Sequence, residues 1–406
     1  MHILFVTSLL PEREPATGFE IANRAIAEAY RTAGARVTVA GFRRPGAAPA
    51  DGPHVDLGEL AIENAGAGAA RKFLWVIAAL RFGLPVGAAK LRVMPERDLL
   101  DRLRGAGPFD AVVVSAAQLP LAFPGLLSLA PSIFVAHNVE HLSAAEMSRS
   151  ARGLGSRLLY RREARLLQAG EARLCAAARV IHSLATADAE RLGLAGDARS
   201  IPLSLSVGRG DAAADDGSRR FDVVMIGTWS WAPNRLGLDW FAAEVAPRLG
   251  ADIRVAVAGR FDGAPPAAPA HVSFLGRVPD AQAFVRSGRV VALATRGGTG
   301  VQLKTIETLE EGMPAVATPS ALRGIGAALP GNVRIADDPE TFAQALTDLV
   351  RRERSGEALR LDGRAFAARQ RADLERGVRA GLRLLGLGPG DEDVPSVPVV
   401  EEALAS

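Results

Sequence analysis

Two successive series of short apolar stretches alternate with longer helical patterns along this chain, and this alternation constrains the fold more than any other feature. It is typical of parallel sheets whose strands are joined by crossover helices. The sequence predicts strands at Ile3–Thr7, Val37–Gly41, Ala111–Ser115, Ile133–Ala136 and Val180–Ser183, then at Asp222–Gly227, Ile253–Ala258, Val272–Leu275, Val290–Ala294, Ala315–Thr318 and Val333–Ala336. We therefore expect an α/β protein with two Rossmann-like, parallel-sheet domains that face each other across a cleft.

The segment between the two series is rich in small and charged residues. It reads SVGRGDAAADDGSRR over residues 206–220, a composition that suits an exposed linker. We predict a first domain over 1–205, a second over 221–362, a closing helix over 363–387, from a helical pattern that starts near Gly356, and a disordered tail over 388–406. Ligands of open parallel sheets bind at the carboxyl ends of the strands, so the cleft is the expected site.

Charge and cysteine content exclude several kinds of function. The 406 residues hold 48 Lys and Arg against 45 Asp and Glu, and no basic run is interleaved with aromatic residues, so we expect no nucleic-acid partner. The single cysteine, Cys175, excludes an internal disulfide and a cysteine-based zinc site. The first residues, MHILFVTSLLPE, read as a buried strand rather than a secretion signal, and we expect a cytoplasmic protein.

The longest apolar stretch, residues 73–87, is interrupted by Arg81 and Pro85 and is too short to span a bilayer. We expect an ordinary core helix here. Because basic residues flank the stretch, the alternative is a peripheral contact with an anionic membrane, on the inner face of the cell membrane, through residues 71–92. A second, arginine-rich segment, 148–173, reads as one long solvated helix, which could also meet lipid phosphates.

Residues 295–318, TRGGTGVQLKTIETLEEGMPAVAT, give the strongest functional signal. They read as a strand, a turn containing Gly297, Gly298 and Gly300, a helix over residues 301–311, and a second strand. The first amides of a helix lack internal partners and carry the positive end of its dipole. The sequence therefore predicts a phosphate site at the glycine turn.

Two side chains on that helix suit a nucleotide. Lys304 and Glu307 lie three residues apart on one face, where an ammonium fits a diphosphate and a carboxylate fits a ribose diol. Lys304 is one of only three lysines in the chain, and a compact ammonium meets phosphate differently from the many guanidinium groups. A plain surface salt bridge between the two side chains is the alternative.

On these residues the chain resembles the retaining GT-B glycosyltransferases, especially glycosyltransferase family 4. The likeness covers nearly the whole chain. The turn after the first strand carries Pro11 and Gly18 before a helix predicted over residues 19–33, and FVAHNVEH, residues 134–141, resembles the family's strand that ends in a histidine near the transferred sugar. In the second half, VVMIGTWSWAPNRLGLDWF, VAVAGRF and HVSFLGRVPD resemble the family's ordered donor-site loops.

The resemblance implies a donor that is a UDP- or GDP-linked sugar. It assigns the ribose to Glu307, the diphosphate to Lys304, the base to backbone near Val278 and Pro279, and the donor sugar to His137, which makes His137 and Lys304 the candidate catalytic residues. It adds Gly18, Gly227, Arg260, Gly298, Thr299 and Gly300 to the donor site. Structural packing against Asn138 is the alternative for His137. No cofactor and no metal site is implied.

Two positions depart from the family pattern. Many relatives have an acidic residue that touches the donor sugar eight positions before the ribose-binding glutamate, and Thr299 stands there in this chain. A phosphate-binding arginine commonly follows the glycine of the first loop of the second domain, but Thr228 follows Gly227 here. Arg235 and Arg260 are the candidate substitutes, and the sugar hydroxyls must be recognised in another way.

The resemblance implies metal-independent, retaining transfer of a sugar to a saccharide or polyprenyl-diphosphate-linked acceptor, in cell-envelope or exopolysaccharide synthesis. Two alternatives stay open. Thr228 and Thr299 would suit a noncatalytic sugar-nucleotide-binding scaffold of a polysaccharide assembly complex, and a sugar-nucleotide epimerase or hydrolase would need a pair of acid/base carboxylates in the cleft. A dinucleotide oxidoreductase is disfavoured because no GxGxxG follows the first strand.

Overall fold

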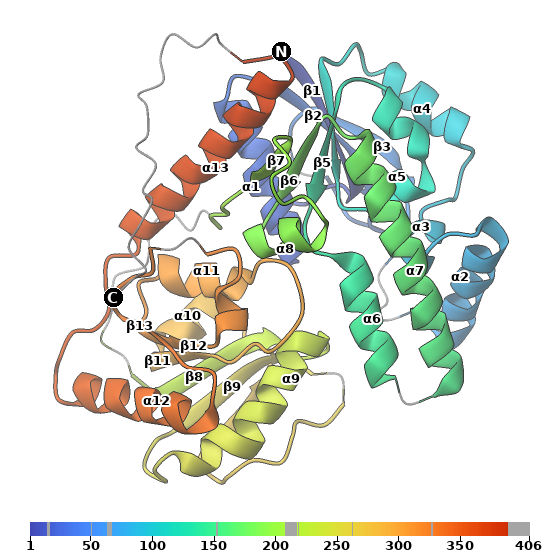
Figure 1. The fold of residues 1–406 in the computed structure, drawn as a ribbon. Coiled ribbons are helices and arrows are strands. Elements are labelled where there is room, and N and C mark those ends of the chain that lie inside the picture. Colours follow the sequence, from blue (N-terminus) through green and yellow to red (C-terminus); the bar gives the residue numbers. More distant parts are fainter. Residues whose placement is uncertain are drawn as a thin grey trace.

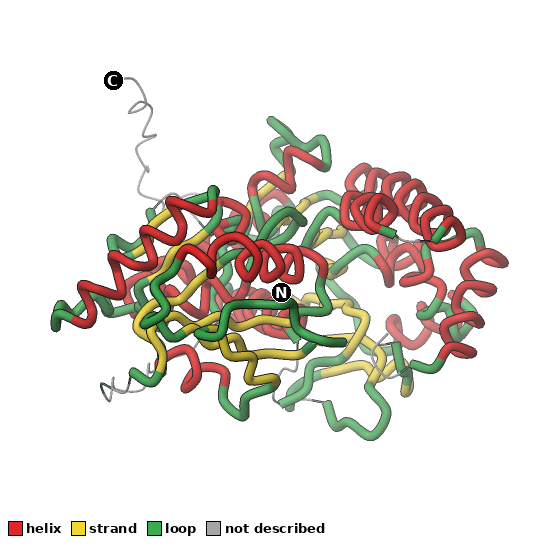
Figure 2. Tube along the Cα trace, turned by 90° about the horizontal axis from the view of Figure 1, so that it is seen from below, coloured by secondary structure: helices red, strands yellow, loops and turns green. Residues whose placement is uncertain are grey.

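The chain folds into two parallel sheets with helices packed around them (Figures 1 and 2). The computed structural model describes residues 1–13, 17–49, 51–62, 67–151, 153–207, 217, 219–261, 263–325 and 328–388. The first sheet has the strand order β3-β2-β1-β4-β5-β6-β7 and the second the order β10-β9-β8-β11-β12-β13. In each sheet the strand order runs in opposite directions on the two sides of the first strand, β1 or β8, as it does in doubly wound nucleotide-binding folds. The predicted fold class is confirmed.

The strands account for all eleven stretches that the sequence predicts. The first sheet holds β1 (His2–Leu9), β2 (Arg36–Arg43), β3 (His54–Glu59), β4 (Ala111–Ser115), β5 (Ser132–Ala136), β6 (Val180–Ser183) and β7 (Ser200–Pro202). The second holds β8 (Phe221–Thr228), β9 (Val255–Arg260), β10 (Val272–Gly276), β11 (Gly288–Leu293), β12 (Ala315–Ala317) and β13 (Val333–Ile335). Sequence reasoning missed β3 and β7. Both are edge strands, and they lack the continuous apolar run that marks a strand buried on both faces.

The helices connect these strands and cover the sheets. They are α1 (Gly18–Thr32), α2 (Ala69–Phe82), α3 (Val86–Ala89), α4 (Glu96–Arg104), α5 (Gln118–Ala122), α6 (Glu140–Ser150), α7 (Leu154–Ala177), α8 (Thr186–Arg191), α9 (Ala232–Trp240), α10 (Ala281–Arg286), α11 (Leu303–Glu310), α12 (Pro339–Arg354) and α13 (Arg364–Leu384). Local signals fix several of their ends. Thr17 and Glu20 form a capping box at the start of α1, and Asp338 caps α12.

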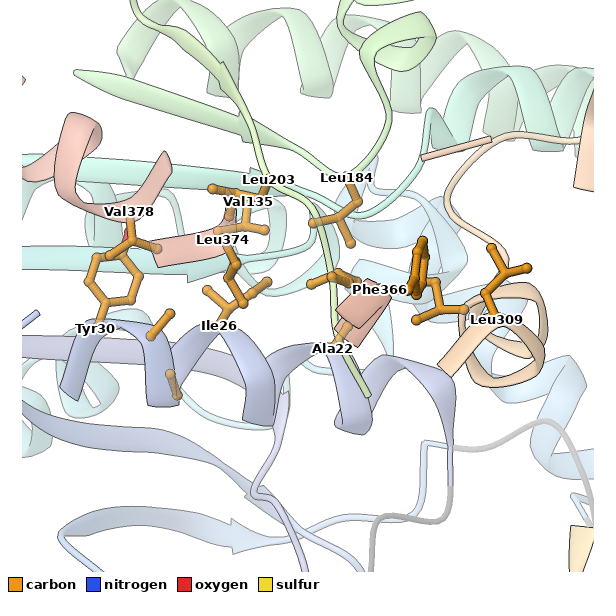
Figure 3. Packing of buried hydrophobic residues seen from close by; sticks show 14 of the residues in the cluster. Ala22, Ile26, Tyr30, Val135, Leu184, Leu203, Leu309, Phe366, Leu374 and Val378 are labelled. Carbon is orange, nitrogen blue, oxygen red and sulfur yellow. The ribbon is translucent and has the colours of Figure 1, made fainter. Parts of the chain in front are cut away.

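The last helix, α13, ties the two domains together. It leaves the second domain and packs along α1 of the first, where Leu374 and Val378 lie over Ile26 and Tyr30 (Figure 3). It begins at Arg364 rather than near Gly356, because the preceding residues run as a loop whose Leu361 amide donates to Gly312 O at 2.9 Å. The predicted tail lies outside the described residues apart from Gly388, as does most of the predicted linker.

Two helical expectations are wrong in detail. Helix α2 is not a core helix: only Ala79 is buried, while Phe73 is 65% and Leu80 is 59% exposed. The arginine-rich segment forms two helices, α6 and α7, that turn back on each other (Figure 1). In the part of the chain that the structure describes, no helix combines the length and the apolar character that a membrane crossing requires.

Candidate active site

The glycine turn between β11 and α11 lies against the first domain. Gly297, Gly298 and Gly300 all have positive φ, from 66° to 80°, a conformation that favours glycine. The amide of Gly300 donates to Asp188 Oδ2 at 2.7 Å, and a Cβ on Gly300 would lie only 2.9 Å from His137 O. The turn is therefore built for close contact with the first domain, at the start of the helix that carries Lys304.

Thr299 also faces the first domain. It is 3% exposed, and its hydroxyl donates to Val139 O at 3.3 Å, accepts from the Val139 amide at 3.2 Å and lies 3.2 Å from Ser143 Oγ. The sequence predicts a donor-binding role for Thr299. The structure places its side chain at the domain interface, where it joins the glycine turn to the start of α6, and the donor-binding role stays a prediction.

Lys304 is held by an asparagine from the neighbouring strand-to-helix connection. Its Nζ donates to Asn234 Oδ1 at 2.6 Å, and Asn234 Nδ2 donates to Thr228 O at 3.1 Å. Burial, together with the nearby positive charge of Arg323, lowers the pKa of Lys304 to about 7. The partner of Lys304 is thus Asn234 rather than Glu307, which is half-buried on the same helix.

Sequence reasoning missed Arg323, which clamps the glycine turn from the second domain. Its Nη1 donates to Gly297 O at 2.8 Å and its Nε to Gly300 O at 3.3 Å. Its Nη2 is buried and has no hydrogen-bond partner among the described residues. An arginine in the loop after β12 gives no sequence signal of this role, because the contact depends on a turn more than twenty residues earlier.

His137 ends a chain of polar side chains in the first domain. Its Nε2 lies 2.8 Å from Ser115 Oγ, the Ser115 hydroxyl donates to Asn23 Oδ1 at 2.5 Å, and Asn23 Nδ2 donates to Thr7 Oγ1 at 3.0 Å. Since the Ser115 proton is directed at Asn23, Nε2 of His137 carries the hydrogen and Nδ1 keeps its lone pair. Burial lowers the pKa of His137 to about 4, so the ring is neutral near pH 7.

The other predicted donor-site residues lie at or beside the ends of strands and helices in both domains. Gly18, the first residue of α1, would place a Cβ 3.0 Å from Leu303 at the start of α11. Gly227 lies beside Gly259, where a Cβ on Gly259 would lie 1.8 Å from Gly227 O. Arg260 is exposed at the end of β9, and Val278 is half-buried in the loop after β10.

Of the two arginines considered as phosphate-binding substitutes, Arg235 is engaged elsewhere. Its Nε donates to Asp239 Oδ1 at 2.9 Å, an ion pair within α9. Arg260 follows directly after Gly259, and its carbonyl accepts from the Trp229 amide at 2.9 Å, so the backbone of the two strand ends is held in register. Lys304 is the cation whose ammonium reaches this loop, through Asn234.

Buried carboxylates in the first domain organise the start of α6. Glu171 accepts from the amides of Glu140 at 2.7 Å and His141 at 3.2 Å, and from His141 Nδ1 at 2.7 Å. Burial, together with the charge of Glu171, raises the pKa of Glu140 to about 8. In the described ranges, no group of three or more His, Cys, Asp or Glu side chains is placed to hold a metal ion.

The second domain matches a family of known enzymes. Residues 220–352 match the family model described as "Glycosyl transferases group 1". A comparison with curated protein sequences finds no match.

The fold matches solved structures over almost its full length. HepE of Anabaena, solved with UDP and glucose, shares 13% identity at a TM-score of 0.59, covering 94% of this chain and 99% of that one. Sucrose-phosphate synthase of Thermosynechococcus elongatus shares 15% at a TM-score of 0.55, covering 95% and 96%. WaaG, a glycosyltransferase involved in lipopolysaccharide biosynthesis, shares 14% at 0.53, covering 95% and 100%. At these identities the likeness shows the GT-B fold.

Proposed function

We propose that this protein moves a sugar from a nucleotide-diphosphate sugar to a hydroxyl acceptor with retention of configuration. The match of residues 220–352 to the glycosyl transferases group 1 model and the GT-B fold support this proposal. One observation carries the proposal. The ammonium of Lys304 lies at the start of α11, directly after the glycine turn, and is fixed by Asn234 at the carboxyl edge of the second sheet. That is where a diphosphate would meet both a cation and free helix amides.

The residues present suit the departure of a nucleoside diphosphate. As the bond between the anomeric carbon and the diphosphate oxygen breaks, negative charge grows on the leaving group, and Lys304 with the first amides of α11 stabilises it. The acceptor oxygen bonds to the same face of the anomeric carbon and passes its proton to the departing diphosphate. No protein nucleophile is required, and the cation at the diphosphate supports a mechanism without a metal.

Donor recognition divides between the domains. Glu307 would bind the ribose, backbone near Val278 the base, and His137 a sugar hydroxyl through the lone pair of Nδ1. HepE was solved with UDP and glucose, which supports a nucleotide sugar as the ligand of this fold. The two domains already touch through the glycine turn, and closure of this kind would exclude water from the donor.

The acceptor belongs to the first domain in this proposal. We place it near His137 and infer a saccharide or polyprenyl-diphosphate-linked acceptor of cell-envelope or exopolysaccharide synthesis, consistent with the lipopolysaccharide role of WaaG. A peripheral contact with an anionic membrane through residues 71–92 would bring a lipid-linked acceptor to the cleft. The cytoplasmic, inner face of the membrane is the expected location.

The test is nucleotide release from a panel of UDP- and GDP-sugars, with and without a membrane extract that supplies acceptors. Acceptor-dependent use of one donor, abolished by Lys304→Ala and Glu307→Ala but not by the exposed control Arg371→Ala, would support transfer. Donor binding without turnover would favour the scaffold, and acceptor-free conversion would favour the epimerase or hydrolase. Product anomers read by NMR test retention, and activity in excess EDTA tests metal independence.

A further inference from the structure

Two stretches of the first domain combine basic charge with exposed apolar side chains. Residues 69–95 and 147–162 hold ten Lys and Arg but no Asp or Glu, although the whole chain is nearly balanced in charge. They make up about a tenth of the chain. Yet of the sixteen large hydrophobic side chains exposed in the described residues, nine lie here: Phe73, Leu74, Ile77, Leu80, Phe82, Val93, Met147, Leu154 and Leu158.

Helix α2 presents its apolar stripe to the outside. Phe73, Ile77 and Leu80 follow the helical i, i+4, i+7 spacing, and all three are exposed. The opposite side of the helix faces the protein, where Ala79 is buried and the Trp75 ring lies 4.1 Å from Lys90 Nζ. This orientation reverses the usual one, in which a surface helix turns its apolar stripe to the core.

The turn between α6 and α7 supplies the second part. Leu154 is 77% exposed and Leu158 64%, on the first two turns of α7, and Arg149, Arg157 and Arg161 beside them are exposed as well. A cluster of exposed apolar side chains among charged ones is typical of an interaction site rather than of an ordinary solvated face.

Direct hydrogen bonds hold the two parts together. Arg162 of α7 donates to Ala79 O at 2.7 Å and to Leu84 O at 3.1 Å, at the carboxyl end of α2. The amide of Val86 donates to Glu163 Oε2 at 2.6 Å. Figure 1 shows α2 beside α7 on the outer side of the first domain, away from the second domain. The two stretches therefore form one fixed surface on the acceptor-binding domain.

We propose that residues 69–95, 147–151 and 153–162 together form a docking surface for an anionic lipid bilayer. The apolar side chains would enter the boundary between headgroups and acyl chains, while the surrounding Lys and Arg meet lipid phosphates. The absence of any acidic residue in both stretches matches an anionic partner. The inference deepens the proposed function, on which it rests for the use of a lipid-linked acceptor, and adds α6 and α7 to the predicted 71–92 contact.

The experiment is sedimentation of the purified full chain with phosphatidylcholine vesicles, with and without phosphatidylglycerol, in the absence of any substrate. We expect binding to anionic vesicles at least about tenfold above neutral ones, weakened by high salt. Phe73→Glu with Leu80→Glu, and separately Leu154→Glu with Leu158→Glu, should each lower it about tenfold. The matched control, Ile335→Glu with Leu361→Glu, changes two exposed apolar residues of the second domain and should bind as wild type does.

Three results would overturn the surface. The first is that the wild type shows no preference for anionic vesicles, and the second is that the control variant loses as much vesicle binding as the other variants. The third is a dimer, seen by light scattering, that the α2 variant dissociates while vesicle binding is absent. The last result would assign the surface to a second copy of the chain. Donor turnover measured on the same variants separates this inference from the proposed function. If the protein binds anionic vesicles but never turns over a donor, the proposed reaction is wrong and the docking surface stands.

Discussion

Lys304 Nζ and Asn234 Oδ1 lie 2.6 Å apart, and this bond joins the helix after β11 to the helix after β8. These two strands are neighbours at the centre of the second sheet. Asn234 is 7% exposed, so the ammonium is held by a buried side chain. The bond therefore brings the Lys304 ammonium to the carboxyl edge of the second sheet.

Replacing that anchor should weaken donor use. Asn234→Ala leaves Lys304 without its partner, and we expect kcat/KM for the donor to fall about tenfold. Asn332→Ala is the control: Asn332 is equally buried in the same domain and donates to Gly312 O and Leu359 O, both at 2.9 Å. It should lower the unfolding temperature without a specific loss of donor affinity. Equal donor affinity for Asn234→Ala and wild type, measured by calorimetry, would remove this role of Asn234.

The lowered pKa of Lys304 predicts a pH dependence with a definite sign. With a pKa of about 7 in the free enzyme, the ammonium that binds diphosphate is lost as pH rises through that value. We therefore expect kcat/KM to fall above pH 7, and kcat to fall only at higher pH, because bound diphosphate favours the charged form. Lys304→Arg keeps its charge and should flatten the kcat/KM profile. An unchanged alkaline limb in this variant would assign the titration to another group.

The same shift affects stability in the opposite direction. The unfolded chain keeps the Lys304 proton up to about pH 10, whereas the folded chain releases it near 7. Between these values the unfolded state binds more protons, so this residue makes the free energy of unfolding rise with pH, by at most about 1.4 kcal/mol per pH unit.

The fold and the glycine-turn helix were predictable because their signals are local. Each buried strand is an apolar run, and the turn, helix start and Lys304 lie within a few residues of each other. Asn234, Arg323 and Asp188 were not predictable. Each is a common polar residue whose role appears only when the fold brings it to the turn, and no spacing along the chain records such contacts.

Helix α2 shows a different limit of prediction from sequence, because its local signal is clear but its orientation is not. Its apolar stripe is visible in the sequence, but periodicity says only that a face is apolar, not whether protein or something else covers it. The sequence favoured burial, and the structure exposes Phe73 and Leu80. A contact from a distant element, here Arg162 of α7 with Ala79 O, holds the side of α2 that faces the protein.

The row of hydrogen-bonded side chains that links His137 to Ser115 and Asn23 predicts that Ser115 positions the imidazole ring of His137. Ser115→Ala removes the acceptor of the Nε2 hydrogen, so both neutral tautomers become populated, and we expect kcat to fall about tenfold with KM for the donor nearly unchanged. Nitrogen NMR of the His137 ring should show the tautomer shift directly. Ser132→Ala, a buried serine on β5, is the control for packing loss. If both variants lose the same activity with no tautomer change, Ser115 is only structural.

Thr299 gives a prediction that separates the structure from the family pattern. The pattern suggests that Thr299→Glu would restore a sugar-binding acid, but the Thr299 hydroxyl is buried against Val139 and Ser143. A carboxylate there would lack a compensating partner, so we expect lower activity and a clearly lower unfolding temperature. Thr299→Ser keeps the hydroxyl and should stay close to wild type, whereas Thr299→Val should lose about 1–3 kcal/mol by leaving the Val139 amide unpaired. Higher turnover in the glutamate variant would show that this side chain faces the donor sugar and not the domain interface.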